Sequence, residues 1–117
     1  MTATNNGITN NGAVQAIGDN SSVSMSATNG SAGAISNSDI VSAGLNVTET
    51  AGTTLTNVKA VTASKGAIEQ KAGGKLWNEA AVDGKTTVKM TSTGADIKND
   101  TTVTAGTTLT QDAHTTL

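Results

Sequence analysis

The sequence predicts an all-β fold, a parallel β-helix or β-solenoid of about five coils of 20–21 residues, forming one domain over residues 1–117. Three observations predict it. An asparagine recurs at a nearly constant interval, an aliphatic residue stands two positions before each of these asparagines, and the chain contains no proline. A unit of about 20 residues cannot bury its own apolar side chains, so it becomes stable by stacking on copies of itself.

The repeated unit opens with the aliphatic residue and the asparagine. The asparagines are Asn37, Asn57, Asn78 and Asn99, spaced 20, 21 and 21 residues apart, and the preceding aliphatic residues are Ile35, Leu55, Leu76 and Ile97. A second aliphatic residue follows each asparagine after three or four positions: Ile40, Val61, Val82 and Val103. We expect the core of the stack to contain Ile35, Leu55, Leu76, Ile97, Val61, Val82 and Val103.

A glycine and a further aliphatic segment complete each unit. The glycines are Gly44, Gly66, Gly84 and Gly106, and the residues after them include Leu45 with Val47, Ile68, Val88 with Met90, and Leu109. Glycines at these places indicate corners that need a positive φ or a tight bend. Each period therefore contains two or three short strands.

The coils follow one another along the chain. Residues 1 to about 11 are expected to be a loose end or an imperfect first half-coil. Coil one fits the period less well: Val14 takes the place of Ile35, and Ala16 stands where the asparagine should be. Coils two to five are expected at about 33–51, 52–73, 74–93 and 94–117.

The direction of the asparagine side chains has two interpretations of equal weight. Leu76 and Asn78 share one face of their strand while Trp77 takes the other, so the asparagines could point inward with the aliphatic residues. Coils stacked about 4.8 Å apart would then let their amides form a hydrogen-bonded ladder. Alternatively, the asparagines sit at corners and tolerate left-handed backbone. Both roles are structural.

Composition separates a solenoid from a disordered chain. Threonine makes up roughly a fifth of the residues, there is one tryptophan and no other aromatic residue, and 14% of residues are charged with a net charge of −2. Disordered chains are usually richer in charge and proline, whereas average usage would give this chain about six prolines. Because a proline would break a ladder at almost any position of stacked strands, its absence follows from the predicted architecture.

Composition also limits the function classes. The near-neutral balance offers no basic patch for nucleic acid, and no segment approaches the length of a membrane span. The first residues have no secretory signal, and cysteine is absent, so no disulfide framework or thiolate site is expected.

We expect neither catalytic residues nor cofactors nor metals. His114, the single histidine, lies beside Asp112 near the C-terminus and is expected to be exposed. Carboxylates such as Asp96, Asp100, Asp83 and Glu79 could offer oxygen ligands to Ca²⁺, but no calcium-binding nonapeptide is present, so they are expected to be solvated. The chain is therefore not expected to be an enzyme.

Trp77 is the one candidate contact residue. An outward indole could anchor a carbohydrate or protein partner, or cover a seam between two protomers. An exposed apolar side chain standing alone usually needs no such explanation.

Three segments carry a resemblance to a known family. GTTLTN, GGKLWNEAAVDGKTTVKM and GADIKNDTTVTAGTTLT resemble the coils of filamentous haemagglutinin-like adhesins, the secreted exoproteins of two-partner secretion. The similarity covers roughly residues 33–117. It implies a right-handed parallel β-helix on the cell exterior that works as a stalk or adhesive rod. A weaker similarity, through Gln70 and Asn78, links the chain to curli-type amyloid subunits, although the spacing is longer and the aromatic residues are missing.

These observations together predict a structural, secreted or surface-located rod or fibre for bacterial adhesion. The alternative is a self-assembling subunit of a functional-amyloid-like fibre in a biofilm matrix or appendage. The expected partner is a second copy of the chain, paired end to end or in a cross-β arrangement, and a surface receptor is a further candidate. Unpaired strand edges at the ends of a stack are templates for such pairing.

Overall fold

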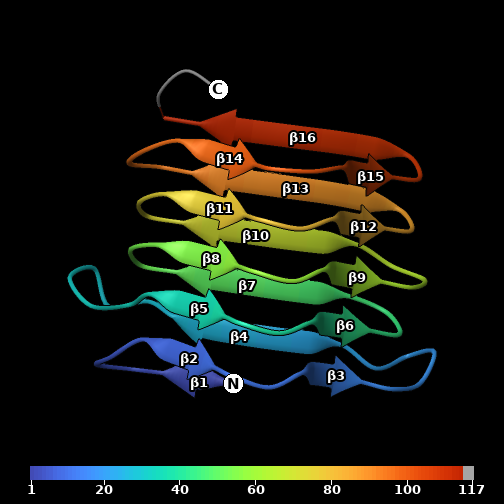
Figure 1. The fold of residues 1–117 in the computed structure, drawn as a ribbon, viewed down its shortest axis with the longest axis horizontal. Coiled ribbons are helices and arrows are strands. Elements are labelled where there is room, and N and C mark those ends of the chain that lie inside the picture. The colour runs from blue at the N-terminus through green and yellow to red at the C-terminus, as the bar shows by residue number, and fades with distance from the viewer. Residues whose placement is uncertain (115–117) are drawn as a thin grey trace.

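The computed structural model describes residues 1–114, and all the regular elements in that part of the chain are β-strands. They form three parallel sheets (Figure 1). Sheet A contains β1 (Thr2–Ala3), β4 (Val23–Ala27), β7 (Val47–Ala51), β10 (Ile68–Ala72), β13 (Thr87–Ser92) and β16 (Thr108–Ala113). Sheet B contains β2 (Ile8–Asn10), β5 (Ile35–Asn37), β8 (Leu55–Asn57), β11 (Leu76–Asn78) and β14 (Ile97–Asn99). Sheet C contains β3 (Val14–Ala16), β6 (Val41–Ala43), β9 (Val61–Ala63), β12 (Val82–Gly84) and β15 (Val103–Ala105).

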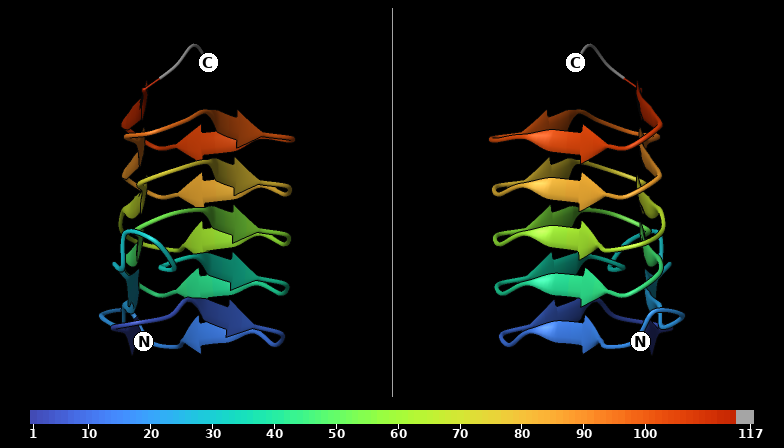
Figure 2. Two further views of the ribbon diagram at one scale, coloured as in Figure 1. Left: turned by 90° about the vertical axis from the view of Figure 1, so that its left-hand side faces the viewer. Right: turned by 90° about the vertical axis from the view of Figure 1, so that its right-hand side faces the viewer.

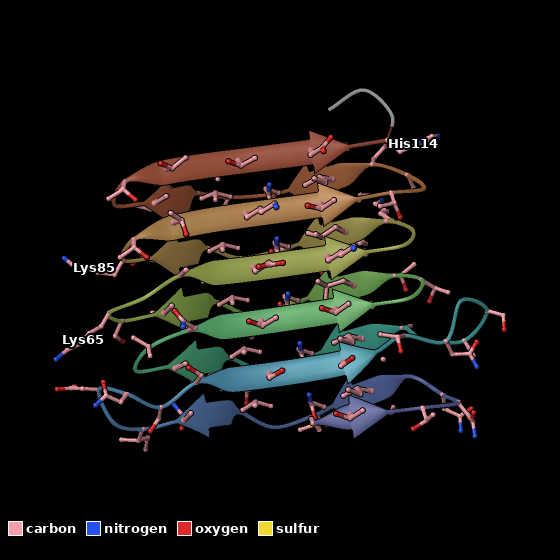
Figure 3. All side chains as sticks on the ribbon, turned by 180° about the vertical axis from the view of Figure 1, so that it is seen from behind. Lys65, Lys85 and His114 are labelled. Carbon is pink, nitrogen blue, oxygen red and sulfur yellow. The ribbon has the colours of Figure 1, made fainter. Side chains whose placement is uncertain are left out.

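One coil passes through sheet B, then sheet C, then sheet A, and five such coils stack from β2 to β16 (Figures 1 and 2). In Figure 1 the chain runs from left to right along sheets B and C and returns behind them along sheet A while it rises, which is a right-handed coil. Figure 3, seen from behind, has sheet A in front. The all-β solenoid of about five coils is confirmed.

The strands form because apolar or amide side chains alternate with polar ones at period two. In β8, Leu55 and Asn57 are fully buried while Thr56 between them is half-exposed. The same pattern recurs in β5 and β11, and each strand pairs in register with its equivalent in the next coil. Equivalent residues therefore form columns that run along the stack.

Three aliphatic columns form much of the core, which also contains Met25, Met90 and inward alanines of sheets A and C. Its sheet B column holds Ile8, Ile35, Leu55, Leu76 and Ile97; its sheet C column holds Val14, Val41, Val61, Val82 and Val103; its sheet A column holds Val23, Val47, Ile68, Val88 and Leu109. The inner coils bury their members of each column to within about 1% exposure, whereas Val14, Val103 and Leu109 in the first and last coils remain partly or largely exposed.

The alignment expected for coil one is wrong, because it assigns residues of sheet C to sheet B. Ile8, not Val14, pairs with Ile35, and Asn10, not Ala16, pairs with Asn37. Val14 and Ala16 belong to sheet C, opposite Val41 and Ala43. Two longer corners, at 17–22 and 28–34, stretch the first asparagine spacing to 27 residues, against 20 in the next coil. A search at the shorter period therefore misses Asn10.

Two smaller expectations also change. Ile40 is only half-buried, and its neighbour Val41, at 1% exposure, fills the core position in coil two. Residues 1–11 carry β1 and β2, so they form part of the stack.

Gly44, Gly66 and Gly106 lie at corners as expected, whereas Gly84 is the last residue of strand β12 and pairs with Ala63 and Ala105. The corner glycines serve close backbone approach rather than positive φ. Within the described residues Gly18 alone has a positive φ, of 130°. A Cβ on Gly73 would collide with the carbonyl oxygen of Gly52 in the coil before it, and one on Gly94 would collide with that of Gly73. At these glycine positions the corners of successive coils are stacked too closely for a side chain.

Candidate functional site

The interior of the solenoid contains a continuous ladder of side-chain amides. At every step the Nδ2 atom of one asparagine donates a hydrogen bond to the Oδ1 atom of the asparagine in the next coil. The distances are 2.6 Å from Asn10 to Asn37, 2.8 Å from Asn37 to Asn57, 3.0 Å from Asn57 to Asn78 and 3.0 Å from Asn78 to Asn99. We call these five residues the amide ladder. The inward interpretation of the asparagines therefore holds, and the corner interpretation is wrong.

Each ladder residue also donates an amide hydrogen to a side chain of sheet A. Asn10 Nδ2 donates to Met25 Sδ at 3.3 Å, and Asn99 Nδ2 donates to Met90 Sδ at 3.5 Å. Between them, Asn78 Nδ2 donates to Gln70 Oε1 at 2.9 Å. Asn37 and Asn57 each donate to a carboxylate, that of Glu49. Every buried side-chain nitrogen and oxygen among the described residues has a hydrogen-bond partner. An unpaired buried polar group would cost about 1–3 kcal/mol, and the ladder avoids this cost.

Glu49 is the most unusual residue of this interior. It is fully buried, its Oε1 accepts from Asn37 Nδ2 at 2.9 Å, and its Oε2 accepts from Asn57 Nδ2 at 2.9 Å and from Gln70 Nε2 at 2.8 Å. Desolvation by burial raises the pKa of this carboxyl group, and the three amide donors offset part of that rise. None of the ion pairs found among the described residues involves it, and its carboxyl oxygens accept from the amides of Asn37, Asn57 and Gln70.

Sequence reasoning missed Asn10 and Glu49. Glu49 could have been found from the alternation Val47-Thr48-Glu49-Thr50-Ala51, in which positions 47, 49 and 51 point inward. The register then places Glu49 between Met25 and Gln70. The alternation marks position 49 as inward, but a glutamate is so seldom fully buried that its residue type argues against this position.

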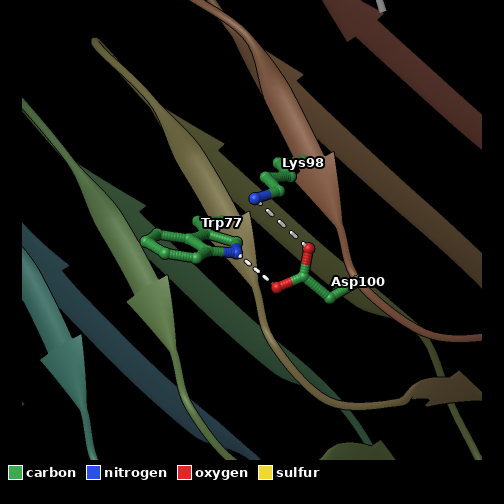
Figure 4. Close-up of polar contacts among 3 residues, drawn as sticks. All are labelled: Trp77, Lys98 and Asp100. Atoms are coloured by element: carbon green, nitrogen blue, oxygen red, sulfur yellow. Dashed lines mark hydrogen bonds and ion pairs between the residues drawn. The ribbon is translucent and has the colours of Figure 1, made fainter.

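Trp77 lies on the outer face of sheet B, half-buried between rungs. Its Nε1 atom donates to Asp100 Oδ2 at 2.9 Å, and Lys98 Nζ lies 3.6 Å from Asp100 Oδ1 (Figure 4). The ammonium groups of Lys75 and Lys98 each lie 4.8 Å from the centre of the indole ring. The ring is therefore held by a hydrogen bond and two cation–π contacts. We call Lys75, Trp77, Lys98 and Asp100 the tryptophan cluster.

The remaining chemical candidates do not converge. His114 is exposed at the end of β16, labelled in Figure 3, and its backbone N–H donates to Ser92 O at 2.9 Å. No group of three or more His, Asp or Glu side chains that could hold a metal ion occurs within residues 1–114, and no pocket was found there. Asp100 is engaged by the tryptophan cluster.

Among residues 1–114 there is no helix long and apolar enough to cross a membrane.

Comparison with known proteins gives no relative: no family model, curated protein or solved structure matches this chain.

Proposed function

We propose that this chain is a structural β-solenoid segment of an extracellular bacterial rod used in surface adhesion. The observation that carries the proposal is the unbroken register of all three sheets together with the amide ladder inside them. Parallel strands paired on both sides, with a hydrogen-bonded interior, resist bending and local opening, which is the property that a stalk needs.

The dimensions define how such a segment would work. The structure measures 35 × 29 × 19 Å, and its longest axis runs along the strands, not along the stack (Figure 1). Five coils are thus a block, and length would come from further coils in the same polypeptide or from stacked copies. The resemblance of residues 33–117 to filamentous haemagglutinin-like adhesins supports the extracellular setting of the proposal.

The tryptophan cluster is the proposed receptor contact. It combines an apolar ring with two ammonium groups and one carboxylate on the flat outer face of sheet B. Such a combination suits a polar, ring-containing partner such as a surface glycan, which stacks on an indole while its hydroxyl groups meet charged side chains.

An adhesion assay tests the proposal. The chain would be displayed on the surface of a non-adherent bacterium, and adhesion to epithelial cells would be measured for the parent, for Trp77→Ala and for Thr56→Ala. Thr56 is the matched control because it is the outward neighbour of Trp77 in register. We expect the parent and Thr56→Ala to adhere and Trp77→Ala to lose most of its adhesion. Parent cells that adhere no better than cells displaying nothing would overturn the adhesion role.

A specific observation favours a second candidate, the self-assembling fibre subunit. Six hydrophobic residues pack against the core yet remain partly exposed: Ala3, Val14, Ala16, Val103, Ala105 and Ala113. All six lie in strands at the two ends of the stack. A second copy stacked on either end would bury them.

A further inference from the structure

The two ends of the stack have matching surfaces. We call the side formed by β1, β2 and β3 the N-terminal end face and the side formed by β14, β15 and β16 the C-terminal end face (Figures 1 and 2). Val14 and Val103 occupy one column at opposite ends and are both half-buried, whereas the members between them are at most 1% exposed. Ala16 and Ala105 repeat this relation in the next inward position.

The amide ladder gives the two end faces opposite polarity. Because each Nδ2 donates toward the C-terminal end, Asn10 presents its Oδ1 atom at the N-terminal end face and Asn99 presents its Nδ2 atom at the C-terminal one. Asn99 uses one amide hydrogen on Met90 Sδ, and in the inner coils the other hydrogen goes to the next asparagine. Head-to-tail stacking would continue the ladder from Asn99 to Asn10 of a second copy, whereas head-to-head stacking would oppose like groups.

The sheets, however, do not end at the same level. Sheet A has six strands among the described residues, and sheets B and C have five. If β14 and β15 of one copy pair with β2 and β3 of the next, β16 must pair with β4 of that next copy. The position beside β4 is taken by β1 (Figure 1).

β1 holds this position weakly. It pairs with β4 at two residues, Ser26 and Ala27, whereas β16 pairs with β13 at six. Three further hydrogen bonds hold residues 1–5: Met1 N donates to Ser24 O, Ser26 N to Met1 O, and Asn29 Nδ2 to Asn5 O. The hydrogen bond from Ile8 N to Ala34 O belongs to β2 and would remain if β1 left.

We propose that copies of this chain stack head to tail and that β1 blocks the stacking until β16 of a second copy displaces it from the edge of β4. In the stack, Leu109 lies against Val23 of the second copy, Val103 against its Val14, and Asn99 against its Asn10. Leu109, which is 45% exposed in the single chain, becomes a core residue. An end-to-end contact between different surfaces does not close on itself, so it extends into a filament. The inference rests on the fibre role proposed above and adds its geometry and its block.

Removing the block tests the proposal. A chain that begins at Asn6 lacks β1 but keeps β2. Static light scattering over a dilution series and electron microscopy would compare it with the full chain. We expect the shortened chain to form filaments one coil wide at a concentration at least about tenfold lower, because about 1.4 kcal/mol of competing contacts corresponds to that factor. Equal association of the two chains would overturn the role of β1.

A matched pair of variants tests the contact surface in the shortened chain. Leu109→Lys places an ammonium group on the C-terminal end face, and Thr110→Lys places one on the outer face of sheet A, because the two positions alternate along β16. We expect Leu109→Lys to abolish filaments and Thr110→Lys to keep them. Both positions are exposed in the single chain, so both variants should fold. Filaments that persist in Leu109→Lys would place the contact elsewhere and contradict the proposal.

Circular dichroism separates this failure from that of the proposed function. A shortened chain that melts cooperatively as a β protein and stays monomeric contradicts the stacking inference but not the proposed role as a solenoid rod. A full-length chain with no cooperative β transition would contradict both proposals.

Discussion

At the scale of single residues, Glu49 makes the stability of the buried interior depend on pH. Three amide nitrogens donate to its two oxygens. The side chains around it, Asn37, Asn57, Met25 and Gln70, are all uncharged. Because burial raises its pKa, the folded protein binds a proton there more tightly than the unfolded chain does. The contribution of Glu49 to stability is therefore greatest below the pKa of the unfolded chain, near 4.5, and falls as the pH rises through the higher folded-state value.

Replacing Glu49 by Gln should remove this pH dependence. Gln70 fills the same inward position in the next coil, where its amide donates to Glu49 Oε2 and Asn78 Oδ1 and accepts from Asn78 Nδ2. We expect the melting temperature of Glu49→Gln to gain on that of the parent as the pH rises from 4 to 8, because glutamine has no carboxylate to desolvate. Thermal melts from pH 4 to pH 8 would measure it.

The control for that experiment is Glu69→Gln, on the exposed face of the neighbouring strand β10. It should keep the pH profile of the parent. A Glu49→Gln protein whose melting temperature still falls between pH 4.5 and pH 8 as the parent's does would show that Glu49 is not the group responsible.

The amide ladder makes Asn57 costly to remove. Asn57 donates to Glu49 and Asn78 and accepts from Asn37, so alanine would remove three buried hydrogen bonds and leave one amide hydrogen of Asn37 unpaired. A buried hydrogen bond contributes about 0.5–1.5 kcal/mol and an unpaired buried donor costs about 1–3 kcal/mol, and we expect Asn57→Ala to lower the unfolding free energy by about 3 kcal/mol. Urea denaturation would measure this. Asn20→Ala, at an exposed corner, should change little, and equal stability of the two variants would refute a buried ladder.

At the scale of elements, the stacking of corners limits what each turn can contain. Gly73 sits directly over the carbonyl of Gly52, whereas a Cβ on Gly30 would meet nothing within 4 Å. We expect Gly73→Ala to lower the unfolding free energy by about 1–3 kcal/mol, the usual range for overpacking. The contact is with backbone, which must move, and not with a flexible side chain.

Gly30→Ala is the matched control and should be neutral or slightly stabilising, because alanine restricts the unfolded chain. Comparing the two in one denaturation series isolates the corner contact. A Gly73→Ala protein as stable as Gly30→Ala would mean that successive corners are farther apart than in this structure.

The strands of coils two to five could be predicted from sequence because their corners have nearly constant length. Leu55 and Asn57 then recur as Leu76 and Asn78, and a period of 20 or 21 finds them. Coil one could not be aligned this way, since the corners at 17–22 and 28–34 add residues without changing the register of β2 on β5. The inward direction of the asparagines needed the structure, because a corner and a strand end are adjacent positions in the sequence.

At the scale of the whole molecule, stability should grow with the number of coils. Each inner coil is paired on both sides, so adding coils adds buried columns without adding end faces. Residues 52–93 contain two complete coils that begin and end at equivalent corners.

Duplicating residues 52–93 in tandem should therefore lengthen the stack by about 9–10 Å, two parallel-strand spacings, and raise the melting temperature. Small-angle scattering and thermal melts would measure both. The same 42 residues inserted in shuffled order serve as the control, since they keep the composition and lose the columns. A duplicated protein no longer and no more stable than the parent would contradict a solenoid built from nearest-neighbour coils.

Hydrogen exchange of the asparagine side-chain amides, followed residue by residue by nuclear magnetic resonance, tests the central claim most directly. A ladder inside a stacked solenoid predicts that the amide hydrogens of Asn37, Asn57 and Asn78 exchange only when the protein unfolds, while those of exposed Asn5 and Asn20 exchange at once. If all five exchange at the same fast rate, the interior ladder does not exist, and the account of this chain as a hydrogen-bonded rod is wrong.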